Sequence, residues 1–218
     1  MKINKTILKI ALSLLLIASI TAHADTLTWD HDADGAASDG SGTWLDANQW
    51  FNAGPDTWDN GAPDDAVFGS GGAGGQITMG AVTAGTVLFD NFTGTYRLNS
   101  GGSLDTSGGI TIGTTAGSEV DIDSPISGTG GITLNSGGVL DLRNVSGGGS
   151  LTYTGPTVVT NGSRLEFNNT NVVDNPNSNT QLNGGVLYKY YNATFNYPLG
   201  TGAGELQILG GESGFTGN

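Results

Sequence analysis

The feature that most constrains this chain is a short apolar–polar–apolar triplet that recurs between glycine-containing turns. Successive side chains of a strand point to opposite faces, so each triplet indicates a short strand with one buried face. The first six triplets begin 10, 12, 8, 11 and 14 residues apart. Strands this short need partners elsewhere in the chain. The triplets are Ile110–Ile112, Val120–Ile122, Ile132–Leu134, Leu140–Leu142, Leu151–Tyr153, Leu165–Phe167 and Leu206–Ile208.

Two all-β architectures accommodate such strands. Even spacing of roughly 8–12 residues is typical of a sandwich or barrel. A β-solenoid instead stacks the short strands of each coil on those of the next. Near-identical phrases favour the solenoid, because "GGITI" recurs as "GGITL" 22 residues later and "NSGGSLD" as "NSGGVLD" 36 residues later. We therefore predict a parallel β-helix over residues 70–218.

The alternation also predicts which side chains face the core. Leu140, Leu142, Leu165 and Phe167 should point inward, whereas Asp141 should face solvent. Glycine pairs such as Gly108-Gly109 precede several triplets, and glycine permits the positive φ angles of tight turns.

One stretch, "LTYTGPTVVTNGSRLEF" at residues 151–167, resembles the autotransporter-associated β-strand repeat, with its Tyr-Thr-Gly turn, Thr/Val-rich strand and Asn/Gly turn. Residues 202–218 resemble the start of another unit, so the last repeat is expected to be incomplete. Residues 29–69, with "GTWLDANQW" and "PDDAVFG", resemble the leading region of secreted proteins that carry these repeats. The resemblance implies a right-handed parallel β-helix in an exported or surface-displayed protein.

The first 24 residues are typical of a cleaved signal peptide. Lys2, Lys5 and Lys9 form a basic region, Ile10–Ile20 is apolar, and Ala22-His23-Ala24 is a small-x-small cleavage signal. The apolar run is shorter than the roughly 20 residues that span a bilayer, and no second such run follows. A mature chain that starts at Asp25, secreted or at the cell surface and without a membrane span, is expected.

The charge of the mature part excludes several partners. Four cations, Arg97, Arg143, Arg164 and Lys189, stand against all 20 carboxylates, which leaves a net charge of −16. Phosphate backbones would be repelled, so no nucleic-acid partner is expected. The chain has no cysteine, so disulfides cannot stabilise it.

A candidate calcium loop lies near the mature N-terminus. Asp30, Asp32 and Asp34 with Gly35 match the opening of a D-x-D-x-D-G loop, in which alternate carboxylates converge on one cation. Ser41 occupies the twelfth position, where such loops carry a bidentate glutamate, although Asp39 or Asp46 could supply another oxygen. A solvated acidic turn is the alternative. Calcium is the one cofactor that the sequence suggests.

All the tryptophans, at positions 29, 44, 50 and 58, lie within thirty residues. One interpretation is an aromatic platform for sugar rings. The other is a cap over residues 25–69, because the open end of a solenoid exposes apolar core and strand edges that must be covered. The cap is the interpretation that we favour.

Catalysis finds little support. His31 is the one histidine of the mature chain, and no cysteine can act as a nucleophile. Carboxylate pairs such as Asp64/Asp65 are explained by acidic turns, and the cations are scattered in sequence. We therefore predict no catalytic residues and a structural or adhesin-like passenger, whose partner is a surface polysaccharide or a host or neighbouring cell surface. The alternative is a secreted carbohydrate-binding module that uses the tryptophan-rich region.

Overall fold

The computed structural model describes residues 24–113, 118–135, 137–143, 151–160, 162–168, 175, 178–190 and 205–209. Within these ranges the chain forms strands and turns and no helix, so no membrane-crossing helix occurs in this part of the protein. The predicted signal peptide falls almost entirely on residues 1–23, which lie outside the described ranges. The all-β prediction is confirmed.

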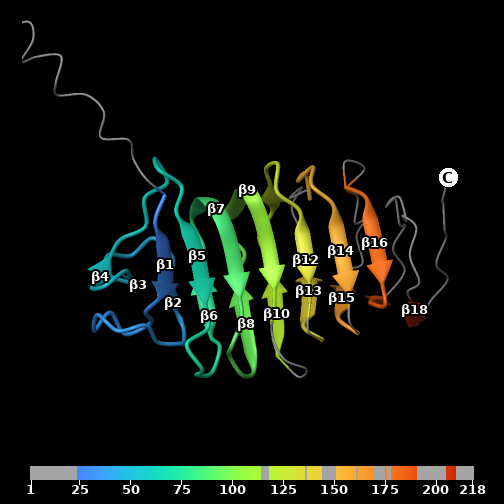
Figure 1. Ribbon diagram of the computed structural model, residues 1–218, viewed down its shortest axis with the longest axis horizontal. Helices are drawn as coiled ribbons and strands as arrows, with labels where there is room; N and C mark the ends of the chain where they lie inside the picture. The colour runs from blue at the N-terminus through green and yellow to red at the C-terminus, as the bar shows by residue number, and fades with distance from the viewer. Residues whose placement is uncertain are drawn as a thin grey trace, which may run out of the picture.

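The strands form two sheets that run the length of the molecule (Figure 1). The first sheet contains β1 (Thr26–Trp29), β3 (Trp50–Phe51), β4 (Pro55–Asp56), β5 (Asp65–Phe68), β7 (Ala81–Phe89), β9 (Ser103–Ile112), β11 (Ile126–Ser127), β12 (Ile132–Leu134), β14 (Thr157–Thr160) and β16 (Thr180–Asn183). The second contains β2 (Gly42–Thr43), β6 (Gln76–Thr78), β8 (Thr95–Leu98), β10 (Glu119–Ile122), β13 (Val139–Arg143), β15 (Arg164–Asn168), β17 (Val186–Tyr190) and β18 (Glu205–Leu209).

The chain passes back and forth between the sheets, and each strand pairs with its equivalent one coil away. Among the named strands, all pairings are parallel except those of β3 with β1 and β4. This is the predicted β-solenoid, and the sandwich alternative is excluded, because its neighbouring strands would be mainly antiparallel.

The 22-residue repeat in the sequence is the period of one coil. In β9 and β12, Ile110 pairs with Ile132, Thr111 with Thr133 and Ile112 with Leu134, so the two phrases lie directly on each other. The 36-residue repeat has a different origin. Its two leucines, Leu104 and Leu140, lie in different sheets, so the shared phrase marks a similar turn before two non-equivalent strands.

Six of the seven predicted triplets lie in strands, and the seventh, Leu151–Tyr153, does not. Its apolar residues are nevertheless buried, and its backbone bonds to the preceding coil. The Thr152 N–H donates to the Ile126 carbonyl at 2.9 Å, and the Thr154 N–H donates to the Gly128 carbonyl at 3.0 Å. The triplet therefore stacks on β11, but it makes too few backbone hydrogen bonds to form a regular strand.

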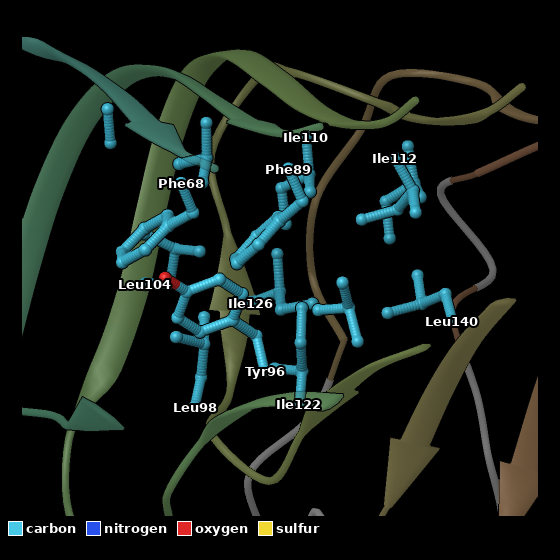
Figure 2. Packing of buried hydrophobic residues seen from close by; sticks show 14 of the residues in the cluster. Phe68, Phe89, Tyr96, Leu98, Leu104, Ile110, Ile112, Ile122, Ile126 and Leu140 are labelled. Atoms are coloured by element: carbon cyan, nitrogen blue, oxygen red, sulfur yellow. The ribbon is translucent and has the colours of Figure 1, made fainter. Parts of the chain in front are cut away.

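The core is a set of columns, each made of equivalent residues from successive coils. One column runs from Tyr96 through Val120, Leu140 and Leu165 to Leu187, and all five are buried. Figure 2 shows the inward side chains gathered between the sheets. The predicted inward positions of Leu140, Leu142, Leu165 and Phe167 are confirmed.

The prediction that Asp141 faces solvent is wrong. Its alternation with Leu140 and Leu142 directs it away from the core, but only 2% of the residue is exposed. Arg143 Nε lies 3.4 Å from Asp141 Oδ2. Stacked coils bring charged neighbours within 5 Å of one another, and long arginine side chains cover the carboxylates between them.

Glycines let neighbouring coils approach closely where β9 lies against the residues directly before β12. A Cβ on Gly130 would lie 2.1 Å from the Gly109 nitrogen, and one on Gly131 would lie 2.1 Å from the Pro156 oxygen. Gly109 also has a φ of 96°, at the point inside β9 where its register with β7 shifts, whereas Gly130 and Gly131 have no positive φ. At those two positions glycine is required for space and not for the turn conformation.

Replacing Leu142 by alanine should lower the free energy of unfolding by about 2–5 kcal/mol through lost burial and a cavity. Thr95→Ala, at an exposed position of the same sheet, is the matched control and should change it by less than about 0.5 kcal/mol. Urea denaturation measures both. Equal losses would contradict the assignment of inner and outer faces.

Gly131→Ala should cost about 1–3 kcal/mol, because the new methyl group meets backbone that cannot move aside alone. Gly54→Ala is the control, since nothing lies within 4 Å of its added Cβ. Thermal melts should show a clear loss for Gly131→Ala and no loss for Gly54→Ala. A Gly131→Ala protein as stable as the wild type would rule out close coil contact there.

Candidate functional site

The N-terminal end of the solenoid is closed by a small hairpin. β3 pairs antiparallel with β1 and with β4, which places both short strands at the end of the first sheet (Figure 1). The expected tryptophan-rich cap is therefore present. β1 and β5 pair in parallel with each other, and β5 with β7, so the parallel ladder already includes residues before position 70. The boundary at residue 69 itself stays a prediction.

The four tryptophans form one buried cluster. Trp29, Trp44 and Trp50 have no exposed surface and Trp58 is 6% exposed. Ring centroids lie 5.1 Å apart for Trp44 and Trp50, and 4.8 Å apart for Trp50 and Trp58. The Trp50 Nε1–H donates to the Trp44 carbonyl at 2.8 Å. Because the rings pack on one another and on Phe68, they present no face on which a sugar could stack.

A carboxylate fastens the cap to the coils. Asp39 Oδ1 accepts a hydrogen bond of 2.5 Å from the Tyr96 hydroxyl. Its Oδ2 accepts bonds from the Ser70 and Gly72 N–H groups at 2.8 and 2.7 Å. Burial, followed by the hydrogen bond to Asp39, raises the pKa of Tyr96 far above its ordinary value, so the phenol stays a donor. Sequence reasoning considered Asp39 only as a calcium ligand and missed this role.

The structure brings Asp30, Asp32 and Asp34 together, with one carboxylate oxygen of each within 4.8 Å of the others. Asp30 is the last residue paired at the end of β1, where it bridges to Ser38. The Ser38 hydroxyl lies 2.9 Å from Asp32 Oδ1 and 3.2 Å from Asp30 Oδ1. The hydrogen bond from Ser38 is the main cause that lowers the pKa of Asp32.

This cluster has the oxygen spacing of a calcium site, since two oxygens bound to one Ca²⁺ at 2.3–2.6 Å can lie up to about 5 Å apart. Its own protein contacts already satisfy part of it, because Asp30 Oδ2 also accepts the Gly35 N–H at 2.9 Å. Asp39 does not join the cluster, as its oxygens bind the coil instead. The calcium site at Asp30, Asp32 and Asp34 stays a prediction.

A second carboxylate cluster, absent from the sequence predictions, lies on the second sheet. Oxygens of Glu119, Asp141 and Glu166, from three successive coils, lie within 4.8 Å of one another. Burial, and then the charges of Asp121 and Glu166, raise the pKa of Glu119. The register of the triplets could have revealed part of this cluster, because Asp141 and Glu166 are central residues that pair across neighbouring coils, whereas Glu119 lies just before its triplet.

Three of the four cations in the mature chain form ion pairs with carboxylates on or beside this sheet. Each ion pair joins groups of the same or the adjacent coil, namely Arg97 with Asp123 at 2.5 Å, Arg143 with Asp121 at 2.5 Å and with Asp141 at 3.4 Å, and Arg164 with Glu166. The arginines look scattered in the sequence, but stacking gathers them on one sheet. Within the described ranges they serve as partners of buried carboxylates.

Comparison with known proteins gives one related sequence. The chain is similar to the adhesin BmaC autotransporter of Brucella suis biovar 1 (strain 1330), with 30% identity over 155 residues. The matched region covers 67% of this chain but only 4% of the length of that protein. No family model matches the chain, so the predicted repeat family is not confirmed. No solved structure matches it either.

Asp39→Asn should lower the free energy of unfolding by about 1–3 kcal/mol, because a charged acceptor of several hydrogen bonds is lost. Asp46→Asn, at an exposed position of the same cap, is the control and should have little effect. Chemical denaturation followed by tryptophan fluorescence reports on the cap directly. No difference between the two variants would contradict the fastening role.

If calcium binds at Asp30, Asp32 and Asp34, millimolar calcium should raise the melting temperature, because a ligand that binds only the folded state stabilises it. Asp32→Ala should reduce that rise, and Asp46→Ala should leave it unchanged. Differential scanning fluorimetry with and without calcium measures the shift. A rise of equal size in Asp32→Ala would place the bound calcium elsewhere.

Proposed function

We propose that this chain is part of an exported, surface-displayed passenger of the autotransporter type, with a structural or adhesin-like role and no catalytic activity. The similarity to an autotransporter adhesin is the observation that carries the proposal. The solenoid fold supports it, because a stack of coils is a quasi-one-dimensional scaffold whose length extends by adding repeats. The proposed partner is a surface polysaccharide or the surface of a host or neighbouring cell.

The arrangement around His31 supports a non-enzymatic role. His31 Nδ1 lies 2.9 Å from the Ser38 hydroxyl, a distance that would suit a base and a nucleophile. However, the single hydroxyl proton of Ser38 is directed to the carboxylates of Asp30 and Asp32. When that proton is bonded to a carboxylate, His31 Nδ1 can only donate to the Ser38 oxygen and does not accept the serine proton. The contacts of Ser38 with His31, Asp30 and Asp32 are therefore those of a hydrogen-bonded turn and not of a catalytic pair.

The carbohydrate-binding alternative loses the feature that suggested it. Sugar-binding platforms need exposed aromatic faces, and the tryptophans are buried in the cap. Among the described residues, Leu45 is the one exposed large apolar side chain. Within the described ranges, polar groups on the outside of the coils are the main surface left for a polysaccharide.

Surface display of the chain on a non-adherent bacterium, through a fused translocator, tests the proposal. Displaying cells should attach to epithelial monolayers or immobilised polysaccharide several-fold more than cells that carry the translocator alone. Proteinase treatment of intact cells should remove both the chain and the attachment. Attachment no higher than the translocator control on every surface would overturn the adhesin-like role.

The same cells provide the test of the non-enzymatic role. Incubation with acidic and neutral polysaccharides should release no reducing sugar above the level seen with the translocator alone. Release of sugar that is lost when the chain is removed by protease would overturn the proposal and establish an enzyme.

A further inference from the structure

The predicted cleavage point lies beside a buried carboxylate that has no cation against it. The Asp25 backbone N–H donates to Asp64 Oδ1 at 2.9 Å, although 39 residues separate the two in sequence. Asp64 is only 7% exposed. Among the described residues no lysine or arginine forms an ion pair with it, and the charges that act on it, from Asp25 and Asp56, are both negative.

The position of the Asp25 nitrogen is set by the sheet. Asp25 precedes β1, and its carbonyl accepts the Asp65 N–H at 2.8 Å, while Thr26 pairs with Asp65 in the parallel ladder. Asp64 is held from the other side, because its carbonyl accepts the Gly85 N–H at 2.8 Å.

We propose that Asp64 is the receptor for the new N-terminus, so that removal of the leader creates an ion pair between the Asp25 α-ammonium and the Asp64 carboxylate. This inference rests on the cleavage after Ala24 that the proposed export requires. It makes leader removal a step that stabilises the first coil of the solenoid.

The chemistry of the step is a hydrolysis by a leader-removing protease. Water adds its hydroxyl to the Ala24 carbonyl carbon, the Ala24–Asp25 peptide bond breaks, and the Asp25 nitrogen leaves as an amine that takes up protons. With an ordinary pKa of about 8, that amine is mainly an ammonium at neutral pH. The amide donor beside Asp64 is thereby replaced by a charged donor at the same nitrogen.

The exchange favours the folded protein. Asp64 is poorly solvated because it is only 7% exposed, and burial is the main cause that raises its pKa. A charge-assisted hydrogen bond is about twice as strong as a neutral one. The free-energy cost of burying Asp64 is the same in the uncleaved and the cleaved chain. Because Asp25 is exposed, its ammonium attracts the Asp64 carboxylate while keeping part of its own hydration.

Two chains with defined N-termini test this. One begins with the free amine of Asp25, and the other begins at His23, so that Asp25 is acylated by Ala24. The free-amine chain should melt about 3 °C or more higher. The gap should vanish in Asp64→Asn and persist in Asp56→Asn, which removes a nearby carboxylate that is not bonded to the nitrogen. Equal melting temperatures for the two wild-type chains, or a gap that persists in Asp64→Asn, would overturn the proposal.

A second measurement covers the case in which Asp64→Asn does not fold. Titration of the wild-type α-amine by NMR should give a pKa above its ordinary value, because the adjacent carboxylate favours the charged form. An ordinary pKa would overturn the ion pair. Both measurements use purified chains, so an absence of adhesion would overturn the proposed function while leaving this inference standing. N-terminal sequencing of exported protein tests the cleavage itself, and a start other than Asp25 would overturn the inference.

Discussion

The structure depends on backbone hydrogen bonds made from each coil to the next. A strand of three or four residues, such as β12 or β10, is not stable alone. Its N–H and carbonyl groups must form hydrogen bonds with other strands when they are buried. Equivalent strands one coil away supply that pairing on both sides. This requirement explains why the coils keep register over the core columns, and why glycines line the places where backbones approach most closely.

A stack built in this way has an end that must be covered. At the N-terminal end the β3–β4 hairpin and the tryptophan cluster provide the cover, and Asp39 bonds the cap to Ser70, Gly72 and Tyr96 of the coils behind it. The aromatic rings contribute burial that a chain without disulfides cannot replace by covalent links. The concentration of tryptophan in this region is therefore a consequence of architecture.

Stacking also organises the charges. Residues at the centres of the triplets form columns in which successive residues lie about 5 Å apart. Like charges in such a column would repel each other if no cation lay between them. Arg143 is placed between Asp121 and Asp141 of successive coils, and Arg164 pairs with Glu166 while its guanidinium lies 5.4 Å from the centre of the Tyr188 ring. The few arginines of this acidic chain are thus used to neutralise carboxylates inside the stack.

The sequence by itself determined the all-β class, most of the strands and the inward residues, because alternation and glycine turns are local properties of each strand and turn. The recurrence of "GGITI" as "GGITL" favoured the stacked coils in which β9 pairs with β12, and the tryptophans favoured a cap. Only the tertiary structure decided the surroundings of the polar groups. The closeness of Asp141 to Glu119 and Glu166, the bonds of Asp39 and the contact of Asp25 with Asp64 join residues from different coils. No local pattern specifies which outward side chains meet across a turn of the solenoid, since that depends on the register and on the loops between strands.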